Sequence, residues 1–330
     1  MNKMFLKLLT ISGIMFMTTG CGGNPESKDE PQKQDNDKYD YVLLAQPVAT
    51  AVLNARDYFS VAHNVQNDYK AKTNNLEITQ ASIFVKDTED VNKINKVNAF
   101  LAMVKSEIAT LMADPQTVLI NATSELEEQF VTGKIGGKPA LLSNLLKNGN
   151  QIGLGFKEAI DNKSSIDAFV STLGLEAITN ENYYQIAEAD ASTTIDIKVA
   201  TPSGAPALAF YNHLNETAQL EIAAANTVLS YLSNSSDKDV VIAPTNSGLD
   251  AMKNGANFKL AATITFGNFF VVSTGNDNNN VMDKGDKVLA FQQKGVAGKL
   301  FNYLYGDKEL VVDYLGDVAA VKDKILTDFQ

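Results

Sequence analysis

Hydroxyl, amide and backbone N–H groups gather in four turns that each follow an apolar, strand-like run. The turns are residues 201–204 (TPSG), 244–247 (PTNS), 292–295 (QQKG) and 45–47 (AQP), and a helix-like pattern follows each one. Free N–H groups at the positive end of a helix dipole hold small anions and polar ligands. In open α/β sheets such turns meet at the carboxyl ends of strands, where ligands bind. The pattern therefore predicts a binding site for a small polar or anionic molecule.

The same residue types also have structural explanations, which the sequence leaves open. Thr201 and Ser203 could serve only to cap a helix N-terminus. His63 and His213 stand apart, without a second ligand at metal spacing, which favours surface or packing roles. The loop at residues 276–286 holds three aspartates, so calcium is conceivable, but without the EF-hand ligand order a solvated loop is favoured. We expect no metal and no cofactor.

The N-terminus predicts secretion and a lipid anchor. An apolar stretch flanked by Lys3 and Lys7 is too short and interrupted for a membrane span, but it fits a secretory signal. It ends in TTGC, and Cys21 is the only cysteine of the chain, so an intramolecular disulfide is excluded. The ending resembles the lipobox of bacterial lipoproteins, with Thr18 where leucine is preferred; an ordinary signal peptide is the alternative. We expect a signal peptide over residues 1–20, lipidation of Cys21 and attachment to the extracytoplasmic face of the cell membrane.

Composition divides the remainder of the 330 residues into a tether and a body. Residues 21–37 carry no large apolar side chain and are rich in Pro, Asp, Lys, Gln and Asn, which is typical of a flexible tether. The whole chain has 45% hydrophobic and 20% charged residues, as soluble globular proteins have. A net charge of −11 without a basic patch argues against nucleic acid as a partner.

From residue 39 onward, strand-like and helix-like patterns alternate, which predicts an α/β fold with parallel sheets. Strands are expected within residues 39–45, 78–87, 195–202, 239–245, 259–274, 287–292 and 309–315, and residues 58–73 are expected to be extended. Helices are expected at residues 91–114, 123–131, 138–149, 155–160, 164–175, 205–214, 246–255, 296–306 and 318–329.

Several of these segments resemble solute-binding lipoproteins of ABC importers, in the nitrate/sulfonate/taurine-like and thiamine-precursor-like group. Residues 201–208 match the family pattern "tPsGaPal", and residues 244–246 match its "PTN". The stretch 265–268 (TFGN) matches the segment before the family's second lobe, and 287–304 matches the start of that lobe. The resemblance implies the type II periplasmic binding fold: two lobes, each a mainly parallel sheet flanked by helices, with a ligand cleft between them.

The order of the matching segments is circularly permuted. The family's "yalLaEPvat" is similar to residues 41–50, with Gln46 in place of the glutamate, and its return strand is similar to residues 78–87. In family order the chain would read 195–330 and then 36–185. The resemblance implies a second lobe built from residues 38–75 and 286–330. It implies a first lobe, with a helical tail, built from residues 76–185 and 195–285. Crossings between the lobes are expected near residues 75–78 and 273–286.

The family layout places the first two turns in one lobe and the other two in the second, with residues 265–268 beside the cleft. The ligand-binding residues it implies are Thr201, Ser203, Gly204, Thr245, Asn246, Ser247, Phe266, Asn268, Gln293, Lys294 and Gln46. A lone lysine such as Lys294 is typical of solvated surface. Because Gln46 stands where the family has glutamate, this position lacks a carboxylate, which argues against a cationic solute.

The function this resemblance implies is capture of a small solute for an ABC permease by a monomeric, non-enzymatic receptor. A surface sensor or adhesin on the same fold is one alternative. An enzyme such as a pyrimidine-precursor synthase is another, but it would need a histidine- and cysteine-bearing site. Only Cys21 and two histidines outside the four turns are present, which disfavours it.

Overall fold

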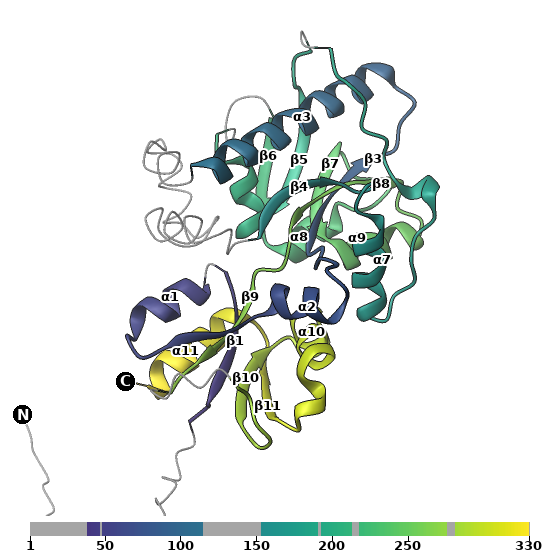
Figure 1. Ribbon diagram of the computed structural model, residues 1–330. Coiled ribbons are helices and arrows are strands. Elements are labelled where there is room, and N and C mark those ends of the chain that lie inside the picture. Colours follow the sequence, from purple (N-terminus) through teal and green to yellow (C-terminus); the bar gives the residue numbers. More distant parts are fainter. Residues whose placement is uncertain are drawn as a thin grey trace, which may run out of the picture. The chain divides into compact units, whose positions relative to one another are not determined.

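The computed structural model describes residues 38–46, 48–114, 153–190, 193–212, 218–275 and 281–329. In these residues the chain is mixed α/β and forms two separate sheets (Figure 1). The α/β class predicted from the sequence is confirmed. The predicted signal, Cys21, the tether, His213, Asp277 and the helices expected at residues 123–131 and 138–149 lie outside the described residues.

The smaller sheet has five strands in the order β11-β10-β1-β9-β2. Its strands are β1 (Tyr41–Ala45), β2 (Ser60–Asn64), β9 (Phe269–Ser273), β10 (Lys287–Phe291) and β11 (Val311–Leu315). Strand β10 runs parallel to β1 and β11, whereas β9 runs antiparallel to β1 and β2.

The larger sheet has six strands in the order β4-β8-β3-β7-β5-β6. They are β3 (Ala81–Lys86), β4 (Leu154–Glu158), β5 (Ile197–Pro202), β6 (Ala218–Ala223), β7 (Val240–Pro244) and β8 (Phe258–Thr265). Strand β5 is parallel to β6 and β7, but β3 is antiparallel to β7 and β8, and β4 is antiparallel to β8. Both sheets are therefore mixed: four strands of each run in one direction, β9 opposes them in the smaller sheet, and β3 and the edge strand β4 oppose them in the larger one.

In both cases the chain crosses over from the other sheet immediately before it forms the inserted strand. Strand β9 enters the five-stranded sheet directly after β8 of the six-stranded sheet, through residues 266–268. Strand β3 enters the six-stranded sheet after β2 of the five-stranded sheet, through α2 (Val65–Lys72) and residues 73–80. The second crossing was expected at residues 273–286; the change of sheet comes earlier, because β9 already pairs with β1 and β2.

Helices cover both faces of each sheet. The long helix α3 (Val91–Ala113) lies on one face of the six-stranded sheet, and α7 (Lys163–Thr172), α8 (Ala225–Ser230) and α9 (Thr245–Lys253) lie on the other (Figure 1). Side chains along β3 alternate between the two faces: Ile83 and Val85 belong to the hydrophobic cluster that contains Phe100 of α3, whereas Phe84 belongs to the cluster that contains Leu249 of α9. On the five-stranded sheet, α1 (Val48–Ala55) packs with α11 (Val318–Asp328), and α2 packs with α10 (Val296–Tyr305).

Two local expectations are wrong, and the structure differs in detail at two further segments. Residues 65–72 form α2 rather than an extended segment, because Asn64 Oδ1 accepts hydrogen bonds from the N–H groups of Gln66 (3.0 Å) and Asn67 (3.2 Å) and caps the helix. Residues 154–158 form β4 rather than a helix, at the edge of the six-stranded sheet. Residues 205–210 form a 3₁₀-helix, η2, and β6 at residues 218–223 was not expected.

Candidate functional site

The four predicted turns do follow strands, and the structure shows what each residue contacts. Thr201 lies within the last residues of β5 and is fully buried, whereas Ser203 in the turn after β5 is exposed and its N–H donates to Ala223 O at 3.0 Å. Gly204 precedes η2 with a φ of 96°, a left-handed conformation that glycine adopts without strain. No side chain caps η2, so the structure does not use Thr201 or Ser203 for capping.

A cluster of polar side chains joins the two crossing segments to the ends of β1 and β7. We call Gln46, Gln80, Ser82, Thr245 and Asn268 the junction cluster. Gln80 Oε1 accepts the Asn268 N–H at 3.1 Å, and Gln80 O accepts the Thr245 N–H at 3.0 Å. The Gln46 N–H donates to Asn268 O at 2.9 Å, and Thr245 Oγ1 lies 2.7 Å from Ser82 Oγ. Three of the predicted residues, Gln46, Thr245 and Asn268, are therefore brought together.

Gln80 and Ser82 were missed by the sequence analysis. Gln80 lies in a crossing segment whose position depends on the pairing of distant strands, with no local signal. Ser82 could have been found, because it is a small polar residue inside the otherwise apolar run of β3 and is fully buried.

Several buried polar atoms beside the junction cluster make no hydrogen bond within the described residues. They are the side-chain oxygens of Thr79, Thr265 and Asn268, whose residues are at most 5% exposed, and Oδ1 of the partly buried Asn246. Leaving such an atom unpaired costs roughly 1–3 kcal/mol. These atoms have almost no accessible surface, so a polar ligand could pair with them and recover that free energy only where the region opens.

Gln46 has a structural role as well. Its Oε1 accepts a hydrogen bond from Thr50 Oγ1 at 2.9 Å and lies 3.3 Å from the Thr50 N–H in the first turn of α1. The side-chain oxygen therefore serves the start of this helix, which leaves Nε2 as the group that Gln46 could offer to a ligand.

A polar groove of about 480 Å³ runs between α9 and α10. The residues that give it polar character are Asn246, Ser247 and Asp250 of α9 and Lys299 of α10. Lys299 Nζ also donates to Leu173 O at 2.7 Å, which ties α10 to the end of α7. Asn246 and Ser247 thus lie where helices that cover the two different sheets meet.

The remaining predicted residues are not joined to the cluster by hydrogen bonds. Gln293 and Lys294 are exposed in the turn after β10. Phe266 is 8% exposed, and its N–H donates to Gly153 O at 2.6 Å, at the start of β4. Its ring lines a different cavity, shared with α2.

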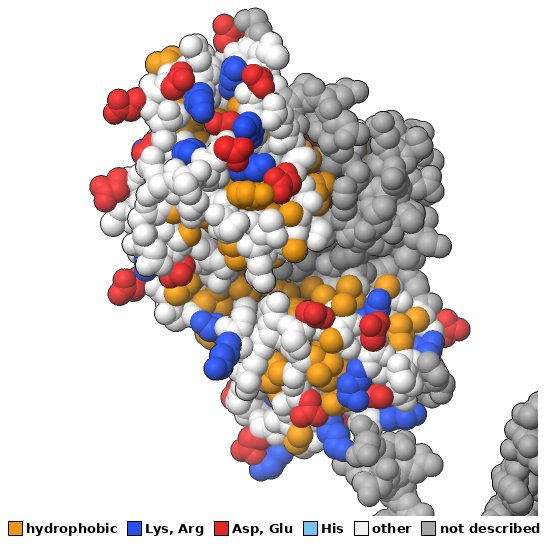
Figure 2. Space-filling view, turned by 180° about the vertical axis from the view of Figure 1, so that it is seen from behind, with side chains coloured by type: hydrophobic (Ala, Val, Ile, Leu, Met, Phe, Trp, Pro, Cys, Tyr) orange, Lys and Arg blue, Asp and Glu red, His pale blue; other side chains and the backbone are white. Residues whose placement is uncertain are grey.

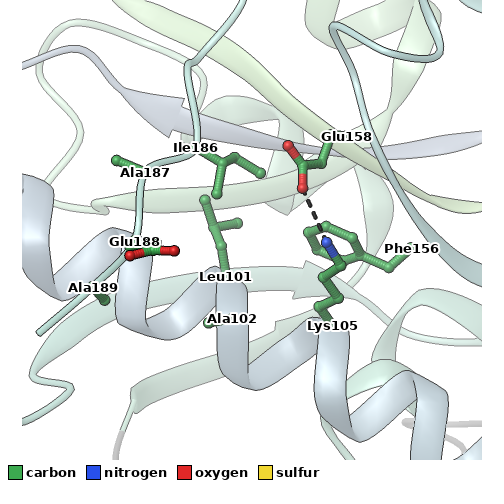
Figure 3. Close-up of a pocket in the computed structure, with 9 residues that line it drawn as sticks. All are labelled: Leu101, Ala102, Lys105, Phe156, Glu158, Ile186, Ala187, Glu188 and Ala189. Carbon is green, nitrogen blue, oxygen red and sulfur yellow. Dashed lines mark hydrogen bonds and ion pairs between the residues drawn. The ribbon is translucent and has the colours of Figure 1, made fainter. Parts of the chain in front are cut away.

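A further cavity of about 390 Å³ lies between α3, β4 and residues 186–189 (Figure 3). Its floor is apolar, with Leu101, Phe156 and Ile186, and an ion pair of 3.0 Å between Lys105 Nζ and Glu158 Oε1 lies at one side (Figure 3). None of the residues predicted to bind ligand lines it.

His63 belongs to a packing network. Its Nδ1 lies 2.9 Å from Asp68 Oδ2, which also accepts a hydrogen bond of 2.5 Å from Tyr305 OH. Burial alone would raise the pKa of Asp68, but the hydrogen bonds from His63 and Tyr305 outweigh it and lower that pKa. Burial, and then the bond to Asp68, raises the pKa of Tyr305 well above its ordinary value. The network holds β2, α2 and α10 together.

Among the described residues, no three histidine, cysteine or acidic side chains are grouped so that they could hold a metal ion. Asp283 and Asp286 of the predicted loop are joined to each other, with the Asp283 N–H donating to Asp286 Oδ2 at 2.7 Å. Within the described part of the chain, no helix combines the length and hydrophobicity needed to cross a bilayer.

Comparison with protein-family models, with curated proteins and with solved structures gives no match to this chain.

Proposed function

We propose that this chain is the extracytoplasmic solute-binding component of an ABC-type importer, built on a two-lobed type II periplasmic binding fold. The observation that carries the proposal is a strand exchange between the sheets: the chain crosses from the five-stranded sheet to insert β3 in the six-stranded sheet, and it crosses from the six-stranded sheet to insert β9 in the five-stranded one. Two bodies joined by two crossings can open and close about them. The carboxyl ends of parallel strands from both sheets then bear the polar turns that a ligand would bridge.

The strand orders also support the permutation. When the chain is followed from β5 to β11 and then from β1 to β3, the same sequence of elements occurs twice. Four strands of one sheet are followed by a crossing, and the crossing leads to the strand inserted in the other sheet. The first four are β5, β6, β7 and β8, and the second four are β10, β11, β1 and β2. Apart from β4, which adds an edge strand next to β8, both sheets then have the same order, second-first-third-inserted-fourth: β6-β5-β7-β3-β8 and β11-β10-β1-β9-β2. This repeat is visible only when the end of the chain is joined to the start of the body.

The two ends of the described body lie close enough for such a join. Lys38 Nζ is 5.0 Å from the centre of the Phe329 ring, and Arg56 Nε donates to Phe329 O at 2.8 Å. Neighbouring ends are the usual condition for a circular permutation that keeps the fold.

The chemistry of the junction favours a small, polar or anionic solute. The predicted residues offer amides, hydroxyls and N–H groups of the first turn of α9, and their charged neighbours are one lysine and one aspartate, Lys299 and Asp250. On the face seen in Figure 2, acidic and basic side chains are interspersed. The proposal also includes delivery of the solute to a permease and a lipid anchor at Cys21. These two parts are supported by the sequence patterns alone.

A thermal-shift screen tests the proposed function. Sulfonates, nitrate, pyrimidines and amino acids are added singly to the full chain, and a ligand that binds only the folded state raises the midpoint of unfolding. We expect one class to raise it in a concentration-dependent way. A flat response to every class would contradict the receptor proposal.

A further inference from the structure

Both crossing segments line a second cavity, of about 380 Å³, which is separate from the groove between α9 and α10. From α2 and the crossing after it come Gln66, Lys70 and Glu77, and from the other crossing come Phe266 and Gly267. Lys157 of β4 and the two asparagines Asn64 and Asn67 add to the polar lining. A volume of this size lies in the range of small-molecule sites.

Close backbone approaches shape this cavity. Gly267 has a φ of 58°, which other residues adopt only with strain, and a Cβ there would stand 2.7 Å from Gln66 Oε1 and displace the Gln66 side chain. Gln66 is 8% exposed, and its Oε1 accepts the Ile78 N–H at 3.0 Å, which fixes the orientation of the amide. Within the described residues, neither Gln66 Nε2 nor the Gly267 N–H has a hydrogen-bond partner. Two donors are thus left unused in a nearly buried position.

The charges of the cavity do not cancel. Glu77 Oε1 lies 3.1 Å from Lys70 Nζ, and Glu77 Oε2 lies 2.6 Å from Lys157 Nζ, so two lysines share one carboxylate. Burial would raise the pKa of Glu77, but hydrogen bonds from Lys157 and Lys70 lower it, so Glu77 is ionised at neutral pH. One positive charge remains, and Lys157 Nζ lies 5.6 Å from the centre of the Phe266 ring.

We propose that this cavity binds a small organic monoanion. Gln66 Nε2, the Gly267 N–H and the ammonium group of Lys157 hold its carboxylate, and the Phe266 ring packs against its apolar part. The site does not depend on what the cleft binds. Only its consequence rests on the proposed function: an anion held by both crossing segments would restrict the lobes' opening and closing.

Titration calorimetry of the full chain with benzoate tests the site, with uncharged benzamide as the matched probe. We expect benzoate to bind at least about tenfold more tightly than benzamide, because a charge-assisted hydrogen bond contributes roughly 1.5–3 kcal/mol. Lys157→Met should weaken benzoate binding by about tenfold or more. Lys70→Met also leaves the cavity without net charge. It is the variant to measure in place of Lys157→Met if Lys157→Met fails to fold.

The matched control is Lys105→Met, which removes a lysine from the ion pair in the other cavity (Figure 3) and should bind benzoate as the unaltered chain does. Bound benzoate should also slow amide hydrogen exchange in residues 64–80 and 266–268. Thr245→Ala/Asn246→Ala should leave benzoate binding unchanged, which separates this site from the proposed solute cleft. No binding of benzoate, or equal binding by Lys157→Met, would overturn the proposal.

Discussion

The side chain of Gln80 accepts the backbone N–H of Asn268 at 3.1 Å, across 188 residues of sequence. These two residues belong to the two different crossing segments, so this hydrogen bond ties the crossings to each other. Asn268 is 5% exposed, which means that its N–H has little access to water if Gln80 is removed.

Gln80→Ala should therefore lower the free energy of unfolding by about 1–3 kcal/mol, the cost of a buried donor left unpaired. Gln80→Glu keeps an acceptor oxygen and should lose less. Urea unfolding followed by circular dichroism measures both, and an unchanged midpoint for Gln80→Ala would show that the bond does not matter for stability.

Helix α9 packs on β3 at Gly248 more closely than any other residue would permit. A Cβ at this position would stand 2.0 Å from Phe84 Cζ, and Phe84 is fully buried. Gly248→Ala should destabilise the fold by about 1–3 kcal/mol through overpacking, although alanine favours the helix.

The control for this substitution is Gly316→Ala, where a Cβ would meet no atom within 4 Å. A second test is Gly248→Ala combined with Phe84→Leu, which should cost less than the sum of the two single changes, since the smaller side chain makes room. Strict additivity in thermal unfolding would refute the steric explanation.

Much of the secondary structure could be predicted from residue patterns, and the sheet pairing could not. The runs that became β1, β5, β7 and β11 are apolar or β-branched and end in turn residues, so their local signal is strong. The direction of β3 and β9 within their sheets carries no local signal, because it follows from chain segments that cross between sheets. That is why parallel sheets were expected and mixed sheets were found.

For the candidate site too, residues that follow recognisable strands could be predicted, and residues placed by the crossings could not. Thr245 and Asn268 follow recognisable strands, whereas Gln80 and Gln66 reach their positions only through the crossings. The residue pattern of β4 predicts a helix, because its bulged pairing with β8 follows from tertiary contacts that its own short sequence does not encode.

Acid should destabilise the protein in part through Asp68. Its pKa is lowered in the folded state, so below its ordinary value of 3.8 the unfolded chain binds more protons, and the stability that Asp68 contributes is lost as the pH falls through the folded pKa. Tyr305→Phe removes one hydrogen bond that lowers this pKa, so its stability should fall less steeply with acid below about pH 4.

Tyr314→Phe is the matched control, because Tyr314 OH donates to Asn302 and not to a carboxylate. Urea unfolding at a series of pH values measures the slopes. If Tyr305→Phe and the unaltered chain lose stability in parallel, the Tyr305–Asp68 bond does not set the acid response.

Cys21→Ser should release the protein from the membrane if this cysteine carries the lipid. The expectation rests on the TTGC sequence and the polar stretch that follows it. Fractionation of cells that express either form is the measurement. Equal membrane association of both forms would contradict a lipid anchor at Cys21.

Asn246 should matter more for solute binding than Thr245, although the two residues adjoin at the start of α9. The Thr245 hydroxyl is already bonded to Ser82 and is fully buried, whereas Asn246 Oδ1 has no partner among the described residues and Asn246 lines the polar groove. With a ligand found by the thermal-shift screen, Asn246→Ala should weaken binding by about 1–3 kcal/mol. Thr245→Ala should chiefly lower stability, because it leaves Ser82 with one hydroxyl partner fewer.

The matched control is Asn254→Ala, the same change at the other end of α9, where Asn254 Nδ2 donates to Asp250 O at 3.0 Å. Titration calorimetry of the three variants separates the possibilities. Equal affinity in a folded Asn246→Ala variant would remove the groove from the solute site and leave the fold proposal standing, since the strand exchange does not depend on this side chain.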